Sequence, residues 1–169
     1  RFFHGYYDNY CYLPLYIFCG DDLLCAKLRP SNIDSSAGSL KELQRIVERI
    51  RRRWPRVEIL IRGDSGFCRE AIMAWCEQSG VDYVFGLAKN ARLNRVLGRE
   101  LHQVKLECER TGEPARAFRD FTYKTRKTWS RERRVVGKAE HLPDKSNPRF
   151  VVTSLSAAEW NPRTLYEDL

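Results

Sequence analysis

The chain has 169 residues, enough for one domain of ordinary size. Hydrophobic residues make up 43% of it and aromatic residues 12%, which excludes a mainly disordered protein. Its 30 basic and 22 acidic residues leave a net charge of +8, which favours contact with a polyanion. No apolar run approaches the roughly 18 residues of a membrane span, so we expect no membrane partner.

The start of the sequence and its cysteines bear on the compartment. The sequence begins with Arg1, without a methionine or a signal peptide, so we expect a piece of a longer cytoplasmic protein. None of the six cysteines forms a C-x-x-C pair, and the three histidines lie apart from them. Zinc sites usually pair their ligands at short spacing, so we expect buried thiols in a reducing compartment rather than a zinc site.

Aromatic and β-branched residues predict the first two strands. A buried strand over 10–19 is expected to turn at Gly20-Asp21-Asp22 and return over 23–29. The paired aspartates would also suit a metal-binding hairpin, but a simple turn accounts for them and no other feature supports such a site.

The next element is an amphipathic helix over 39–53, with apolar residues at helical spacing. Ser39 is expected to cap its start, with Glu42 as the capping-box partner. Pro55 is expected to end it.

Strands and helices then alternate. The sequence predicts a strand over 57–61, a helix over 69–78 that ends at Gly80, a strand over 81–87 and a helix over 90–110. Such alternation predicts an α/β fold with parallel strands, and the preceding hairpin adds antiparallel pairing. We therefore expect a mixed sheet flanked by helices.

The pattern changes after residue 110. Strands are expected over 117–123, 133–137 and 150–154 with no helix between them, followed by a helical or irregular segment from 156. We accordingly divide the chain into three parts. These are a core over 1–110, a basic β-rich insertion over 111–155 and a final segment over 156–169.

The positive charge is concentrated in one segment. Residues 110–139 hold ten basic and three acidic residues, a net +7 of the chain's +8. Aromatic residues are interleaved with the basic ones, and together they suit the phosphates and bases of nucleic acid. A solvated, charged hairpin is the alternative. The predicted nucleic-acid contacts are Lys124, Arg126, Lys127, Trp129, Arg131, Arg133, Arg134 and Lys138.

Asp64 is the strongest candidate for catalysis. It follows an apolar strand and precedes a helix, between Gly63 and Gly66. In open α/β sheets, ligands bind outside the carboxyl ends of the strands, and a carboxylate there can hold Mg²⁺. Capping of the following helix is the alternative role. A single carboxylate does not make a catalytic metal site.

Several segments together resemble a known family. The motif Ile61-Arg62-Gly63-Asp64-Ser65-Gly66-Phe67 resembles the second-aspartate motif of DDE transposases from bacterial insertion sequences. Further segments resemble the flanks of that motif in the same order along the chain. They are residues 4–7 with 13–15, residues 81–90 and residues 149–155.

The resemblance implies an RNase H-like catalytic domain that cuts and joins DNA. In that family two aspartates and one glutamate bind two Mg²⁺ ions, or Mn²⁺. Asp64 would be a catalytic residue and metal ligand, the first aspartate would precede Arg1, and the glutamate would follow Leu169. This chain would then be a central fragment, inactive alone. Trp129 resembles a tryptophan that stacks on a displaced base in some relatives.

The same resemblance implies the partners and location. Transposon-end and target DNA would be the partners, a homodimer would form in a synaptic complex, and the enzyme would be associated with the nucleoid. Two other interpretations stay open: a non-catalytic, basic nucleic-acid-binding module and a different RNase H-like nuclease.

Overall fold

The computed structural model describes residues 2–5 and 8–167, His4 by its backbone alone. Tyr6 and Tyr7, which belong to the first family-like segment, lie outside the described residues. The chain forms two compact units, Arg1–Ile59 and Leu60–Leu169. The boundary between them does not coincide with the one expected at residue 110.

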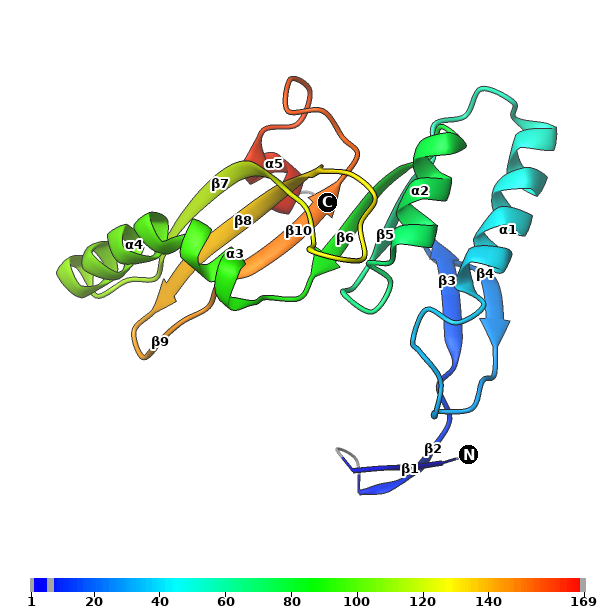
Figure 1. Ribbon diagram of the computed structural model, residues 1–169, viewed down its shortest axis with the longest axis horizontal. Helices are drawn as coiled ribbons and strands as arrows, with labels where there is room; N and C mark the ends of the chain where they lie inside the picture. Colours follow the sequence, from blue (N-terminus) through cyan, green and yellow to red (C-terminus); the bar gives the residue numbers. More distant parts are fainter. Residues whose placement is uncertain (1, 6–7, 168–169) are drawn as a thin grey trace. The chain divides into compact units, whose positions relative to one another are not determined.

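The first unit contains two antiparallel hairpins and a helix (Figure 1). Its elements are β1 (Phe2–His4), β2 (Asn9–Cys11), β3 (Leu15–Cys19), β4 (Asp22–Lys27) and α1 (Ser39–Arg53). The expected strand over 10–19 is therefore two strands. It is also mostly exposed rather than buried, since the side chains of Tyr10, Tyr16 and Phe18 are each more than half exposed.

Helix α1 has the predicted bounds, but its start differs. Gly38 is the N-cap residue with a left-handed φ of 76°, which glycine adopts without strain. The Ser39 hydroxyl donates backwards to the Ser36 carbonyl, and Glu42 pairs with Lys27 and Arg45. The prediction of a capping box was therefore wrong, because the side chains of Ser39 and Glu42 both have other partners.

The second unit is built on one mixed sheet in the strand order β5-β6-β10-β8-β7, with β9 (Lys145–Ser146) paired to β8. The other strands are β5 (Leu60–Gly63), β6 (Asp82–Leu87), β7 (Ala115–Tyr123), β8 (Arg133–Leu142) and β10 (Arg149–Thr153). Strands β5 and β6 are parallel, and the other neighbours are antiparallel. The prediction of a mixed α/β sheet is confirmed.

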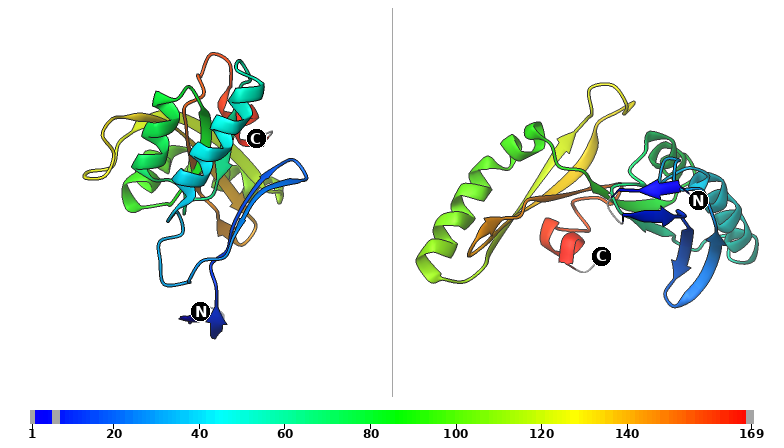
Figure 2. Two further views of the ribbon diagram at one scale, coloured as in Figure 1. Left: turned by 90° about the vertical axis from the view of Figure 1, so that its right-hand side faces the viewer. Right: turned by 90° about the horizontal axis from the view of Figure 1, so that it is seen from below.

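Helices flank this sheet (Figure 2). They are α2 (Glu70–Gln78), α3 (Ala91–Val96), α4 (Gly98–Thr111) and α5 (Pro162–Glu167). Helices α3 and α4 lie against one face of the sheet and α5 against the other (Figure 2). On the α5 face, Val84, Val136 and Leu165 form a buried apolar cluster. Within the described residues, no helix has both the length and the apolar character to cross a bilayer.

The single helix expected over 90–110 is interrupted at Leu97. The Leu97 side chain is fully buried, and a Cβ added at Gly137 of β8 would lie 3.0 Å from its Cδ1 atom. The missing side chain at Gly137 thus leaves room for Leu97 on the sheet. Packing at this point and the low helix propensity of Gly98 account for the break.

Residues 111–155 do not form a separate body in the structure. Their strands β7, β8 and β10 continue the sheet that begins with β5 and β6. The hydrophobic residues of β10 pair on one side with β6 and on the other with β8. The basic segment is therefore an integral part of the second unit.

Candidate functional site

Asp64 lies in the turn that joins β5 to α2. One of its carboxylate oxygens, Oδ1, accepts a hydrogen bond from the Gly66 N–H at 2.8 Å, and its carbonyl accepts one from the Phe67 N–H at 3.1 Å. The N-cap position of α2 is Arg69, which makes no side-chain cap. Asp64 therefore shapes its own turn and remains exposed to solvent, rather than capping the helix.

Gly86 of β6 lets this turn lie close to the sheet. A Cβ atom added there would lie 3.0 Å from the Ser65 nitrogen and 3.3 Å from the Asp64 carbonyl carbon. Backbone atoms cannot yield to such a contact as the end of a flexible side chain can. Gly86 is therefore required for the observed position of Asp64. The sequence signal was a glycine inside a strand, which often marks a close backbone approach.

The exposed cations gather on the loop between β7 and β8, residues 124–132, here called the basic loop. Four of the eight predicted nucleic-acid residues are exposed and belong to it: Lys124, Arg126, Lys127 and Arg131. Arg131, whose side chain is largely exposed, lies 3.8 Å from the mostly buried carboxylate of Glu77. Within the described part of the chain, Arg126 and Lys127 have no ion-pair partner.

Trp129 fixes the basic loop to the body of the unit. Its side chain is only 5% exposed and meets the Tyr123 ring edge-on at 5.8 Å. The Arg133 guanidinium lies 5.6 Å from the centre of the indole ring. The Thr125 hydroxyl accepts hydrogen bonds from the N–H groups of Thr128 and Trp129. The indole is thus the buried anchor of the loop in this conformation.

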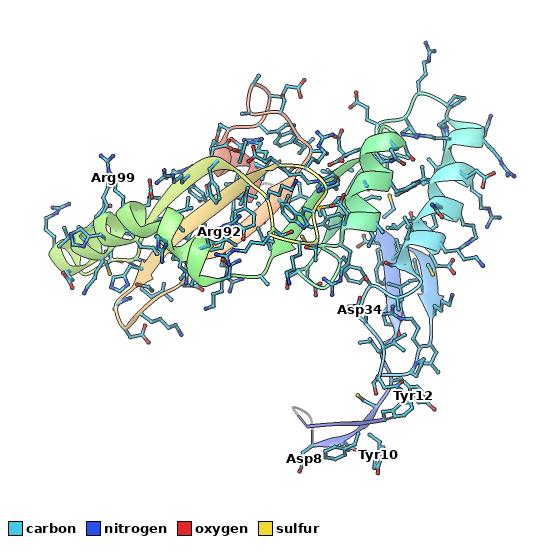
Figure 3. The ribbon with its side chains drawn as sticks, in the orientation of Figure 1. Asp8, Tyr10, Tyr12, Asp34, Arg92 and Arg99 are labelled. Atoms are coloured by element: carbon cyan, nitrogen blue, oxygen red, sulfur yellow. The ribbon has the colours of Figure 1, made fainter. Side chains whose placement is uncertain are left out.

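Helix α3 supports the start of the same loop. The Arg92 guanidinium lies over the Tyr123 ring at 4.1 Å and donates to the Lys124 carbonyl. Figure 3 shows Arg92 beside the basic loop, whereas Arg99 of α4 projects in a different direction. Asn90 caps α3 and also donates to the Tyr123 hydroxyl. Contacts from α3 therefore order one end of the loop.

Arg133 is buried and binds two carboxylates of α2. Its Nη1 lies 2.7 Å from Glu70 and its Nε 2.7 Å from Glu77, and its side chain is 2% exposed. The Ser130 hydroxyl donates to Glu70, and the Tyr83 hydroxyl donates to Glu77. We call these residues the Arg133 network. It joins β8 and the basic loop to the helix that follows the Asp64 turn.

Burial and pairing act in opposite directions on these acids. Burial raises the pKa of Glu70 and of Glu77. The hydrogen bonds from Arg133, those from Ser130 to Glu70 and from Tyr83 to Glu77, and the charge of Arg133 together outweigh it, so that each pKa lies below its ordinary value. Burial also raises the pKa of Tyr83, and its hydrogen bond to Glu77 adds to the effect. Both carboxylates therefore stay ionised and bound to Arg133 at neutral pH.

Arg134 and Lys138 face the opposite side of the sheet. Arg134 binds Asp120 through two nitrogens and donates to the carbonyls of Leu155 and Trp160. Lys138 pairs with Glu140 at 3.2 Å and lies 5.3 Å from the Tyr166 ring. These two cations, like Arg133, have partners within the protein.

Comparison with protein families matches the whole chain, residues 1–169, to the group described as Transposase DDE domain group 1. The chain belongs to this family. A search of curated proteins found no match. Transposases act on DNA, and their DDE domains generally use divalent metals. The mixed sheet flanked by helices is consistent with the RNase H-like fold expected of such a domain.

The described residues of this DDE domain do not complete a metal centre. No group of three or more His, Cys, Asp or Glu side chains comes together among them. Asp64 offers one exposed carboxylate, of which one oxygen already accepts the Gly66 N–H. An oxygen ligand suits Mg²⁺ or Mn²⁺, but one carboxylate cannot by itself hold a pair of ions.

Proposed function

We propose that this DDE domain contributes Asp64 as a metal-binding carboxylate to DNA strand cleavage and transfer. The observation that supports it is the turn itself. The hydrogen bond from the Phe67 N–H and the close approach at Gly86 hold the Asp64 backbone in place. The carboxylate, which accepts the Gly66 N–H through one oxygen, stays exposed just after a strand of the sheet. A bound metal would polarise the phosphodiester and activate the attacking oxygen. Asp64 would hold that ion.

The 169-residue chain is proposed to be inactive alone. Asp64 is a single carboxylate, and the described residues contain no group of three or more His, Cys, Asp or Glu side chains that could hold a metal ion. Two-metal phosphoryl transfer needs several carboxylates around its ions. The proposal thus places the remaining ligands, and with them activity, in a longer protein that contains this domain.

The basic loop is proposed to bind the DNA backbone. Its exposed cations Lys124, Arg126, Lys127 and Arg131 can neutralise phosphates, and among the described residues Arg126 and Lys127 can do so without giving up an ion pair. Arg133, Arg134 and Lys138 are assigned to folding because their partners lie within the protein. For Trp129, stacking on an unpaired base would require the indole to leave its contacts with Tyr123 and Arg133, so we assign it the role of anchor.

The test compares metal-dependent DNA cleavage by this chain and by a version extended at both ends, with and without Asp64→Asn. We expect cleavage only from the extended version, and we expect Asp64→Asn to abolish it. Asp144→Asn, an exposed carboxylate in the turn after β8, is the matched control and leaves cleavage intact. Cleavage that survives Asp64→Asn in the extended version would refute the role of Asp64.

A non-catalytic DNA-binding module is the second candidate. The favouring observation is that the described residues include the whole exposed basic loop but complete no metal centre. This candidate predicts DNA binding that is sensitive to salt and indifferent to Mg²⁺. An extended version that binds DNA but never cleaves it would favour this candidate.

A further inference from the structure

A cavity of about 480 Å³ lies on the α5 face of the second unit. Strands β5, β6 and β10 line it with Arg62, Gly86 and Val151, and α5 lines it with Leu165 and Tyr166. Small-molecule sites typically occupy about 300–1,000 Å³. The cavity is therefore large enough for a ligand with more than one chemical part.

The cavity borders the Asp64 turn through Gly86. This glycine lines the cavity, and a Cβ added to it would meet the Asp64–Ser65 backbone at 3.0–3.3 Å. Arg62 of β5 lines the cavity as well and precedes Asp64 by two residues in the sequence. A ligand in the cavity would thus lie next to the turn that presents the carboxylate.

The lining has two chemically different parts. Arg62 is exposed, and no hydrogen bond or ion pair joins its side chain to another of the described residues. Val151 and Tyr166, both partly exposed, supply apolar and aromatic surface. A guanidinium binds phosphate through paired N–H groups, and an aromatic or aliphatic surface packs against a flat, weakly polar ring. A phosphate joined to a nucleobase matches both parts, whereas a sugar phosphate would leave the apolar part uncovered.

We propose that this cavity binds one nucleotide of a single DNA strand, with its phosphate on Arg62 and its base against Val151 and Tyr166. The proposal rests on the DNA-processing function above and specifies where the strand lies relative to Asp64. Arg62 is then a substrate-binding residue, distinct from the cations of the basic loop.

The test measures binding of a fluorescent, 5′-phosphorylated single-stranded tetradeoxynucleotide in EDTA, so that no metal bound by Asp64 contributes. Arg62→Ala should weaken binding about tenfold or more, because a charge-assisted hydrogen bond is lost. Arg62→Lys should retain part of the affinity. Val151→Phe, which fills the cavity, should weaken binding as well. Arg110→Ala, an exposed arginine at the end of α4, should change nothing.

Competition by smaller ligands and substitutions outside the cavity show whether the tetranucleotide binds in the cavity. Deoxyadenosine and inorganic phosphate should each compete more weakly than the phosphorylated nucleotide dAMP. Lys145→Ala, at an exposed lysine of β9 outside both the cavity and the basic loop, should leave tetranucleotide binding unchanged. The proposal is overturned if the chain shows no saturable binding, if Arg62→Ala and Val151→Phe bind as tightly as the original, or if Lys127→Ala alone removes binding.

Discussion

Two groups of cations lie close together in the sequence between Lys124 and Lys138, but they differ in their exposure and in their partners within the protein. Those on the basic loop are exposed, and Arg126 and Lys127 face only solvent among the described residues. Those on β8 are paired: Arg133 with acids of α2, Arg134 with Asp120, and Lys138 with Glu140. The same residue types therefore stabilise the fold in one group and remain available for DNA in the other.

The difference arises from strand geometry. Successive side chains of a β-strand point to opposite faces. Arg133 therefore meets α2 on one face, and Arg134 meets the segment before α5 on the other. The loop has no sheet face to bury its cations against, so they stay in water. The net charge of residues 110–139 therefore overstates the number of cations that are free to contact a phosphate.

Replacing Arg133 should have the largest effect. Arg133→Met keeps much of the buried volume but leaves Glu70 and Glu77 without their partner, and loss of one member of a buried ion pair costs about 3–5 kcal/mol. We expect a decrease of this order in the free energy of unfolding, measured with urea. Arg126→Met on the basic loop serves as the control, with a change below about 0.5 kcal/mol. Equal unfolding midpoints for the two variants would contradict the division into two groups.

Removing the buried indole should have the next largest effect. Trp129→Ala should lower the free energy of unfolding by about 3 kcal/mol, as for other large-to-small aromatic changes in a core. Thermal or urea unfolding measures this loss. If the variant instead kept full stability and bound single-stranded DNA more weakly, Trp129 would act on the DNA and belong with the exposed group.

Acid should weaken the Arg133 network in part. The pKa values of Glu70 and Glu77 lie below their ordinary value in the folded state. Such groups stabilise the fold above the pKa of the unfolded chain, about 4.3 for glutamate, and this contribution is lost as the pH falls through the folded-state pKa. The free energy of unfolding should therefore decrease below about pH 4.5.

The control for this pH dependence is Arg133→Met. Without the guanidinium, burial remains as a cause that raises both pKa values, so the acid-induced loss should become smaller. A residual dependence should persist, because Glu42 and Glu140 also have lowered pKa values. If the free energy of unfolding had the same pH dependence in the original protein and in Arg133→Met, Arg133 would not be the cause of the lowered pKa values of Glu70 and Glu77.

The sequence predicted local features well. The bounds of α1, the turn at Gly20 and the glycine that ends α2 follow from spacing and turn chemistry, and the structure has all three. The Asp64 turn was found in the same way. Each of these features depends on residues near one another in the chain, where periodicity and propensity carry the information.

Features that depend on distant partners were missed. Nothing near Arg133 in the sequence shows that Glu70 and Glu77 will meet it, although their spacing of seven places both acids on one helix face. Leu97 breaks a helix because Gly137 leaves space for it, forty residues further on. The cavity beside Asp64 needs α5 to cover the sheet. Only the tertiary structure brings these groups together.

Removing the exposed cations Arg126 and Lys127 should have the smallest effect on stability, but it should weaken DNA binding. The double substitution Arg126→Ala with Lys127→Ala should change the free energy of unfolding by less than about 0.5 kcal/mol, because neither side chain has an ion-pair partner among the described residues. Duplex DNA binding should weaken about tenfold, and the slope of log affinity against log salt should flatten by about 1.8, since each lost phosphate contact contributes about 0.9. Filter binding across a salt series measures both quantities, with Lys145→Ala on β9 as the matched control.

An unchanged slope would remove the basic loop from the interface. The exposed cations would then resemble the paired ones in making no contact with DNA, and the difference between the two groups would concern stability alone.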